Sequence, residues 1–338
     1  MSDVYGVLGA GSWGTALAVH LARCGRSVLL WGRSEDVVRD IAERGSNRRY
    51  LPEVEIPTAV TTTHRLEDLA RCRTVLVVVP SHGFRSVLRD FLDVSTVEGD
   101  LHVVSAAKGV EADTVARMSE IAFEEAVKAD RSVRFAVLSG PTFADEMSAG
   151  SPTAAVVAAA DAAVAQKLQA ELSGRNLRLY STADVAGVEL GGAVKNVVAI
   201  AAGVVAGLGF GHNTLAALIT RGLHEMTRLG LACGGRARTF SGLAGLGDLV
   251  LTCTGSQSRN RQTGEALAAG RTLAEIEAGM TMVAEGVRNA KSVLELARRR
   301  AVEMPITEQM EKVLYEGRAV RAAVEDLMSR DLKSETEL

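Results

Sequence analysis

One lysine stands in a segment where lysine is uncommon. Lys195 lies in a run of apolar and small residues that is typical of a buried helix. A lysine there usually extends its ammonium to the surface, but Gly191 and Gly192 before it and the uncharged run 197–220 after it favour burial. A buried lysine loses proton affinity and can act as an acid or base near neutral pH. We therefore expect Lys195 to be catalytic.

Asp248 is the candidate charge partner of that lysine. It follows the glycine-rich segment 242–247, and glycines at this density indicate close approach of two backbones. A buried ammonium needs a nearby carboxylate, which is the role we expect for Asp248. A solvated turn aspartate is the alternative, and the sequence alone does not separate the two.

Two further segments carry positive charge where an anion could bind. Ser258 is expected to cap a helix over 259–269 that opens with Arg259 and Asn260. The helix dipole, the first N–H groups and a guanidinium together favour a phosphate, whereas a plain cap with surface arginines is the alternative. Lys108 follows a predicted strand, where its ammonium would face a ligand cleft unless it is an ordinary loop lysine.

The elements that position these residues begin with a glycine-rich turn. The segment GAGSWG lies between an apolar strand pattern at 4–8 and a helical pattern at 15–22. Gly9 allows a tight turn, Gly11 lets a pyrophosphate approach the backbone, and Gly14 lets the helix pack closely. The helix dipole and the first N–H groups then face a phosphate. We expect a dinucleotide cofactor at this turn.

The second predicted strand bears on the choice of cofactor. NAD-specific folds place a carboxylate at its end for the ribose 2′-hydroxyl, but here Arg33 and Ser34 stand there. The cation of Arg33 suits a 2′-phosphate. We therefore expect NADP or NAD as cofactor, with NADPH used at least as well as NADH. The alternative is that Arg33 stacks on the adenine and accepts either cofactor.

The first half of the chain alternates strand and helix patterns. This alternation predicts a Rossmann-type, doubly wound parallel sheet in a dinucleotide-binding domain over 1–183. Ligands bind outside the carboxyl ends of such strands, so three loops should line one cleft: 80–82, 107–109 and 139–142. The strands are expected at 4–8, 28–32, 74–79, 102–106, 135–138 and 154–158.

Helical patterns dominate after residue 184 and predict an all-α substrate domain over 184–330, with a frayed tail at 331–338. The junction of two domains is the natural place for a substrate. Glycines at 207–211 interrupt the uncharged run 197–220, so we expect no membrane span; whether that run is core or subunit interface stays open. The helices are expected at 185–206, 214–230, 259–269, 284–300, 305–316 and 318–329.

Bulk composition excludes several classes of protein. With 338 residues and a net charge of −3, the chain has room for two domains but no basic field for nucleic acid. Its four cysteines form no CxxC pair and its six histidines no HxxxH pair, so we expect neither a disulfide framework nor a metal. No signal-peptide pattern precedes the first strand, which favours a cytoplasmic protein.

Several long motifs together carry a family resemblance over about residues 4–328. They are GAGSWGTALA, VVVPSH, SGPTFA, GVELGGAVKNVVAIAAG, NTLAALITRGL and GLAGLGDLVLTCTGSQSRNR. The chain resembles the bacterial NAD(P)-dependent glycerol-3-phosphate dehydrogenases. The resemblance implies reversible hydride transfer between dihydroxyacetone phosphate and sn-glycerol 3-phosphate, whose formation feeds glycerophospholipid synthesis.

The same resemblance implies roles for individual residues. The catalytic lysine of the family falls on Lys195. The implied substrate contacts are Lys108, Gly140, Thr142, Lys195, Asp248, Ser258, Arg259 and Asn260. Beside the glycines of the turn, the implied cofactor contacts are Ser12, Trp13, Arg33, Tyr50, Lys108, Ala144, Arg259, Val283 and Glu285.

Two other functions stay open on the sequence alone. Another two-domain dehydrogenase, acting on a hydroxy acid or sugar acid, would also use a lysine but would not need a phosphate site at 258–260. A cofactor-sensing protein without turnover would lack a buried acid or base, and Lys195 with Asp248 argues against it. A homodimer is the assembly we consider, and the sequence does not fix it.

Overall fold

A computed structural model describes residues 4–280, 284–332, 334 and 335. The chain folds into two compact units. The first contains the residues up to Lys108 together with Ala116–Val185, and the second contains Gly109–Val115 and the residues from Ala186 onward. The main division thus falls two residues beyond the predicted one at 183/184. The predicted tail 331–338 lies partly outside the described residues.

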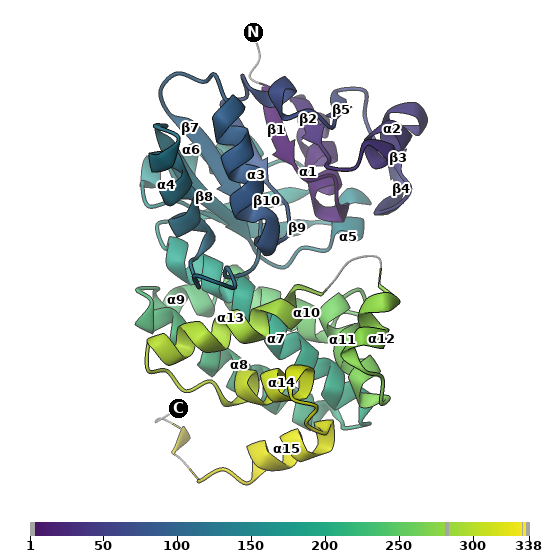
Figure 1. Cartoon of the computed structure of the whole chain (residues 1–338), viewed down its shortest axis with the longest axis vertical. Coiled ribbons are helices and arrows are strands. Elements are labelled where there is room, and N and C mark those ends of the chain that lie inside the picture. Colours follow the sequence, from purple (N-terminus) through teal and green to yellow (C-terminus); the bar gives the residue numbers. More distant parts are fainter. Residues whose placement is uncertain (1–3, 281–283, 333, 336–338) are drawn as a thin grey trace. The chain divides into compact units, whose positions relative to one another are not determined.

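The first unit is built on an eight-stranded sheet of order β10-β9-β8-β7-β6-β1-β2-β5 (Figure 1). All neighbouring strands are parallel except β8 and β9, which are antiparallel. The Rossmann-type prediction is confirmed, with the correction that β9 and β10 run against the other strands. The strands are β1 (Val4–Leu8), β2 (Ser27–Trp31), β5 (Val60–Thr63), β6 (Thr74–Val77), β7 (Leu101–Ser105), β8 (Val133–Ser139), β9 (Thr153–Ala158) and β10 (Leu177–Thr182).

Two of these strands are not among the predicted ones. Strand β5 has the sequence VTTT and lies at one edge of the sheet, and β10 alternates apolar and polar residues at the other edge. Edge strands bury less surface, so neither has the continuous apolar run that marks a central parallel strand. A separate hairpin is formed by β3 (Ser46–Asn47) and β4 (Leu51–Glu55).

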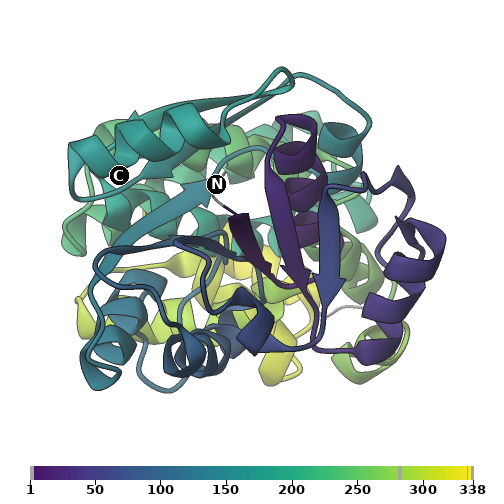
Figure 2. The same cartoon turned by 90° about the horizontal axis from the view of Figure 1, so that it is seen from above.

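Helices cover both faces of the large sheet. They are α1 (Ser12–Arg23), α2 (Glu35–Arg44), α3 (Ser81–Val94), α4 (Met118–Lys128), α5 (Ala144–Ser148) and α6 (Ala162–Leu172), with a 3₁₀ turn η1 (Leu66–Leu69). Figure 2 shows α1 and α6 on one face and α3 and α4 on the other. On the first face, Val7, Leu30 and Leu76 of the strands pack with Leu17 of α1 and Leu168 of α6.

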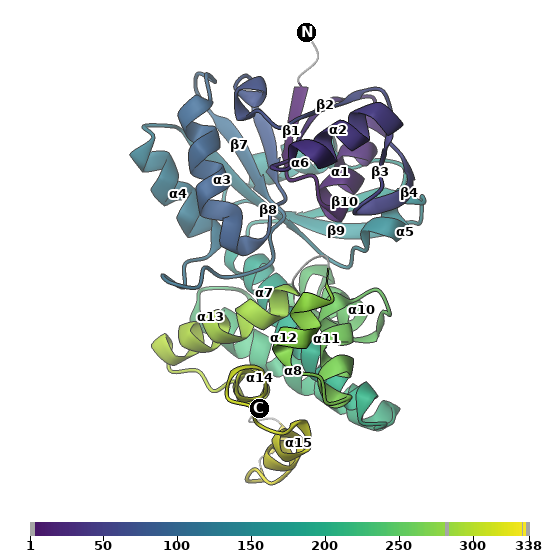
Figure 3. The same ribbon diagram turned by 45° about the vertical axis from the view of Figure 1, so that its right-hand side comes forward.

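The second unit is helical (Figure 3). Helix α7 (Val185–Gly207) forms its centre, because its residues from Gly187 to Val205 are buried and contribute to two hydrophobic clusters. The six predicted helices each agree within two residues at either end. The other elements are α8 (His212–Ala232), α9 (Ala237–Phe240), a π-turn η2 (Leu243–Gly247), α10 (Asp248–Thr254), α11 (Arg259–Ala268), α12 (Leu273–Ala278), α13 (Glu285–Arg299), α14 (Pro305–Tyr315) and α15 (Val320–Met328).

Helix α7 is long and apolar enough to cross a membrane, but 89% of its most apolar window is buried inside the protein. Such burial is typical of a core helix. The predicted interruption is present, since α7 ends at Gly207 and α8 begins at His212. The α7 part of the uncharged run is therefore core, whereas Phe210 in the connecting turn is 38% exposed.

A buried carboxylate joins α8 to α14. Glu225 accepts hydrogen bonds from the backbone N–H groups of Ile306 and Thr307 and from the Thr307 hydroxyl. It thereby caps the start of α14, whose first N–H groups have no partner within the helix. Burial raises the pKa of Glu225 to about 7, although these hydrogen bonds favour its charged form.

The short segment Gly109–Val115 belongs to the helical unit although it follows Lys108 of the first unit directly. Val110 and Val115 are buried in a cluster with Leu190 of α7. Arg299 of α13 donates a hydrogen bond from Nη1 to the Thr114 carbonyl oxygen, at 3.2 Å. Burial of these two valines thus holds the segment that follows Lys108 against the helical unit.

Candidate active site

The glycine-rich turn has the geometry of an anion site. Gly9 has φ +127°, and a Cβ on Gly14 would lie 1.8 Å from the Gly9 carbonyl oxygen, so both positions require glycine. A Cβ on Gly11 would meet nothing within 4 Å. Helix α1 has neither a side-chain cap nor an acidic residue in its first turn. The first N–H groups of α1, at Ser12 and Trp13, suit the pyrophosphate of a dinucleotide.

A buried asparagine ties a second predicted cofactor contact to this turn. Asn47 donates from Nδ2 to the Ala10 carbonyl oxygen at 3.0 Å and to Thr15 Oγ1 at 2.8 Å. Its Oδ1 accepts from the Tyr50 N–H at 3.3 Å. Tyr50 therefore lies near the glycine-rich turn, although Asn47 itself is not among the predicted residues. Arg33 follows β2 as an exposed side chain.

Three predicted substrate contacts meet at one carbonyl group. Lys108 Nζ and Thr142 Oγ1 both donate to the Gly140 carbonyl oxygen at 3.1 Å. Gly140 has φ +146°, and a Cβ there would lie 2.9 Å from the Ala155 Cα, so the sharp turn after β8 requires glycine. Ala144 begins α5 directly after this loop. The carboxyl ends of β7 and β8 thus bring two of the three predicted loops together.

In the helical unit, the predicted pair of Lys195 and Asp248 is present. Lys195 is 5% exposed and Asp248 is 1% exposed, and Lys195 Nζ donates to Asp248 Oδ1. Nζ also donates to Thr252 Oγ1 at 2.9 Å, while Oγ1 donates to the Asp248 carbonyl oxygen at 2.6 Å. Because the hydroxyl proton is directed to that carbonyl, a lone pair of Oγ1 faces the ammonium. Thr252 is absent from the predicted residues.

Close backbone packing brings Asp248 to the lysine. A Cβ on Gly191 of α7 would lie 2.5 Å from the Ala244 carbonyl oxygen in η2, so glycine is needed where η2 crosses α7. Lys195 lies one helical turn beyond Gly191, on the same face of α7. Asp248 begins α10 immediately after η2. The glycines of the two segments therefore position a carboxylate against a buried ammonium.

The start of α11 is anchored to the same helix. Ser258 Oγ accepts from the Arg261 N–H at 3.3 Å, as predicted for the cap. Asn260 Nδ2 donates to Asn196 Oδ1 at 2.9 Å, and its Oδ1 accepts from the Gly286 N–H at 2.9 Å. The Asn260 amide is thus held at both ends within the protein, and its second Nδ2 proton and its backbone N–H suit a substrate phosphate. Arg259 is exposed.

One predicted cofactor contact lies at the start of α13. Glu285 is the first residue of that helix and precedes Gly286, which bonds to Asn260. Val283 lies outside the described residues. Asn196, which follows the lysine and holds α11, is not among the predicted residues; no local pattern distinguishes it from an ordinary helical asparagine.

The described residues offer no metal site, and the thiol nearest to Lys195 is not reactive. Within residues 4–280, 284–332, 334 and 335, no group of three or more His, Cys, Asp or Glu side chains could hold a metal ion. Cys253 is adjacent to Thr252, but burial raises the pKa of its thiol to about 12. It is therefore protonated at neutral pH and is a poor nucleophile.

Comparison with known families decides which class of protein this is. Residues 5–165 match the model of the NAD-dependent glycerol-3-phosphate dehydrogenase N-terminus, and residues 184–325 match that of the C-terminus. The chain belongs to the NAD-dependent glycerol-3-phosphate dehydrogenase family. The resemblance over about residues 4–328 is thereby confirmed.

Relatives and solved structures agree with this assignment to the glycerol-3-phosphate dehydrogenases. An NAD(P)+ glycerol-3-phosphate dehydrogenase of Koribacter versatilis is 50% identical over 332 residues, covering 97% of this chain and 98% of its own. One from Geobacter sulfurreducens is 49% identical over 337 residues, covering 99% of both chains. The crystal structure of glycerol-3-phosphate dehydrogenase from Coxiella burnetii, 40% identical, has a TM-score of 0.92 and covers 97% of this chain and 99% of its own.

More distant structures share only the fold. A ketopantoate reductase from Ralstonia eutropha is 16% identical with a TM-score of 0.59, covering 96% of this chain and 99% of its own. The alternative of a hydroxy-acid or sugar-acid dehydrogenase therefore has support in architecture alone, whereas the family models and near relatives are those of glycerol-3-phosphate dehydrogenases.

Proposed function

We propose that this chain transfers hydride reversibly between NAD(P)H and dihydroxyacetone phosphate, giving sn-glycerol 3-phosphate for glycerophospholipid synthesis. The observation that carries the proposal is the buried ammonium of Lys195, held by Asp248 and Thr252. Family membership supports the choice of substrate, because the near relatives carry the name glycerol-3-phosphate dehydrogenase.

Lys195 acts as the acid and the base. Reduction of a ketone places negative charge on the former carbonyl oxygen, and an ammonium beside that oxygen stabilises the charge and donates a proton. In the reverse direction the neutral amine accepts the proton of the hydroxyl group. Asp248 and Thr252 fix the position of Nζ before the substrate binds, which lowers the cost of orienting it.

The substrate phosphate binds at the start of α11. The backbone N–H groups of Arg259 and Asn260 and the Arg259 guanidinium supply donors and positive charge there. Ser258 holds the helix start in place. Lys108, with Gly140 and Thr142, adds a second cationic group for the anionic substrate.

NAD(P)H, when bound, supplies the hydride, and the protein supplies position and charge. The turn Gly9–Gly14 suits its pyrophosphate, with Ser12 and Trp13 at the first turn of α1. Arg33 meets the adenosine end and makes NADPH at least as good a cofactor as NADH. The further cofactor contacts in this proposal are Tyr50, Lys108, Ala144, Arg259, Val283 and Glu285.

Location and assembly follow from the same proposal. A cytoplasmic enzyme fits a chain in which α7, the one helix of the described residues that is long and apolar enough to cross a membrane, is a core helix. A homodimer is the proposed assembly, and the exposed Phe210 in the turn after α7 is a candidate contact. Light scattering of the purified protein gives the mass in solution, and Phe210→Ser should reduce the dimer fraction if that contact is part of the interface.

Oxidation of NADPH by the purified protein tests the activity. Dihydroxyacetone phosphate should support turnover, and hydroxypyruvate and other keto acids should not. Lys195→Met should lower kcat by roughly 10²–10⁴-fold, the usual span for loss of a general acid or base, with little change in cofactor binding. Lys312→Met, which alters an ion-paired lysine on α14, is the matched control. A Lys195→Met enzyme within a few-fold of wild type would remove the lysine from the chemistry.

A further inference from the structure

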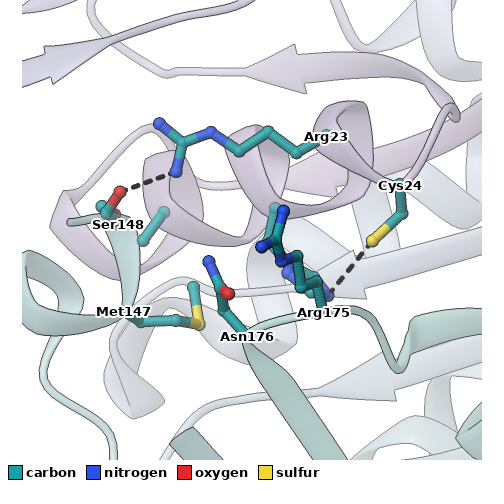
Figure 4. A pocket seen from close by; sticks show the side chains of 8 residues that line it. Arg23, Cys24, Met147, Ser148, Arg175 and Asn176 are labelled. Carbon is teal, nitrogen blue, oxygen red and sulfur yellow. Dashed lines mark hydrogen bonds between the residues drawn. The ribbon is translucent and has the colours of Figure 1, made fainter. Parts of the chain in front are cut away.

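A small cavity lies in the first unit between the C-terminal part of α1 and the end of α5. Its volume is about 40 Å³, enough for roughly three water molecules. Arg23 lies eleven residues beyond Ser12, or about 16 Å along the helix from the pyrophosphate position. The lining residues are Ala16, His20, Arg23, Cys24, Met147, Ser148, Arg175 and Asn176 (Figure 4).

The charge of this cavity is positive. Arg23 and Arg175 line it, and no lining residue is acidic. Arg175 has no hydrogen bond or ion pair with any residue in the described part of the chain. In Figure 4 the side chains of Arg175 and Asn176 project toward α1, and the Arg23 guanidinium reaches Ser148. Both arginines are exposed, so the cavity is open to solvent at its charged side.

Several backbone carbonyl groups around the cavity already have donors. Arg23 Nη1 donates to the Ser148 carbonyl oxygen at 2.6 Å. His20 Nε2 lies 2.9 Å from the Leu172 carbonyl oxygen, and because a carbonyl only accepts, that nitrogen carries the proton. Burial lowers the pKa of His20, so its ring is neutral and the positive charge comes from the arginines. The carbonyls of Asp145, Glu146 and Met147 in α5 accept from Ala149, Ser151 and Gly150.

Some donor groups that line the cavity, in contrast, have protons that no described residue accepts. Ser148 is 4% exposed, and its Oγ is buried without a hydrogen-bond partner among the described residues. A guanidinium has five N–H donors, and Arg23 uses one of them on the Ser148 carbonyl. A buried hydroxyl without a partner costs free energy unless a ligand or water completes it. A hydroxyl can both donate and accept, and the two arginines favour a partner that accepts hydrogen bonds and carries negative charge.

We propose that this cavity binds a phosphate dianion, either inorganic phosphate or the phosphate group of a small monoester. Arg23 and Arg175 supply the charge, and the Ser148 hydroxyl and the Asn176 amide supply neutral donors. The site is distinct from the proposed substrate phosphate position at α11, which is in the other unit. A bound phosphate would link α1, α5 and the segment before β10, so it would stabilise the first unit against unfolding.

Titration of inorganic phosphate into the full-length protein, followed by calorimetry and by thermal unfolding, tests this site. The titrations use an Arg259→Ala background, because the proposed substrate position also takes phosphate. Arg175→Gln should raise the Kd for phosphate about tenfold or more, the loss expected for one charge-assisted hydrogen bond. Ser148→Ala should raise it a few-fold. Arg175 is exposed, so the folded protein should tolerate its replacement.

Matched controls separate this site from general ionic effects. Arg178→Gln removes a nearby exposed arginine that stacks on Tyr180 and does not line the cavity, so phosphate binding should be unchanged. In phosphate-free buffer, Arg175→Gln with Arg259 intact should keep the wild-type kcat and KM. Glycerol phosphate, titrated alongside, tells whether a monoester fits as well as free phosphate. Equal phosphate affinity of the Arg175→Gln and Arg178→Gln proteins, or equal stabilisation by chloride at the same ionic strength, would overturn the proposal.

Discussion

Replacement of Thr252 by valine tests the arrangement around Lys195 most directly. Valine has nearly the shape of threonine but lacks Oγ1, which accepts from Lys195 Nζ at 2.9 Å and donates to the Asp248 carbonyl oxygen at 2.6 Å. A hydrogen bond to a charged group contributes about 1.5–3 kcal/mol. Loss of the bond that holds the ammonium should therefore lower kcat roughly 10–150-fold, and KM should change little.

A neighbouring threonine provides the matched control. Thr254 lies in the same helix α10, and its Oγ1 donates to the Val250 carbonyl oxygen at 2.8 Å, the same bond to the preceding turn. It is exposed and has no bond to Lys195 among its described contacts. Thr254→Val should keep wild-type kcat, and Thr252→Ser, which retains the hydroxyl, should keep most of it.

Steady-state oxidation of NADPH with dihydroxyacetone phosphate is the assay, with urea unfolding of each variant to show that it is folded. The pH dependence of kcat adds a second readout, because a change around the ammonium should move the pH at which activity falls. If the valine replacements at Thr252 and Thr254 gave the same kcat, the only role of the Thr252 hydroxyl would be its hydrogen bond within α10. A change confined to KM would equally contradict its role in positioning Lys195.

Other predictions concern the phosphate, the cofactor and stability. Arg259→Ala should lower kcat/KM for dihydroxyacetone phosphate about ten- to hundredfold, since it loses a charge-assisted bond; an unchanged value would remove Arg259 from the site. Arg33→Asp should weaken NADPH at least about tenfold more than NADH, measured as the ratio of kcat/KM values, and an unchanged ratio would mean that Arg33 does not read the 2′ position. Burial raises the pKa of Glu225 to about 7 from 4.5, so the folded protein binds more protons than the unfolded chain between these values. Its contribution, up to about 3 kcal/mol of unfolding free energy, should be present below about pH 4.5 and lost as the pH rises through about 7. Urea unfolding should show this loss relative to Glu225→Gln, and a difference between the two proteins that does not vary with pH would refute it.

Local patterns in the sequence were enough for six strands of the large sheet, for six helices of the second unit and for several individual residues. The turn Gly9–Gly14 is specified within six residues, because a tight turn and a close helix start both demand glycine. The Ser258 cap is equally local, since its hydroxyl bonds an N–H three residues on. Helix bounds in the second unit follow from apolar periodicity and glycine breaks, and each predicted bound lies within two residues of the observed one.

Contacts between distant segments were beyond such patterns. Helix α7 is apolar on every side, so its sequence cannot say which face meets which neighbour, and Lys195 could be judged buried or exposed. The approach of η2 to Gly191 decides the matter by bringing Asp248 and Thr252, 53 and 57 residues away, to Nζ. Thr252 gave no signal because its bond to the preceding turn is ordinary for a helical threonine.

The direction of two strands, and the unit to which Gly109–Val115 belongs, were also known only from the tertiary structure. Strand β9 has an apolar run like the central strands, and a strand pattern carries no information about direction. The reversal of β9 and β10 relative to β8 was therefore not predictable. Gly109–Val115 reads as a loop after β7, yet burial of its two valines places it in the helical unit. Sequence determined which residues could do chemistry and which local elements would form, because those depend on neighbours within a few positions. Tertiary packing decided which of them meet, because a buried charge and its partner are fixed by elements far apart in the chain.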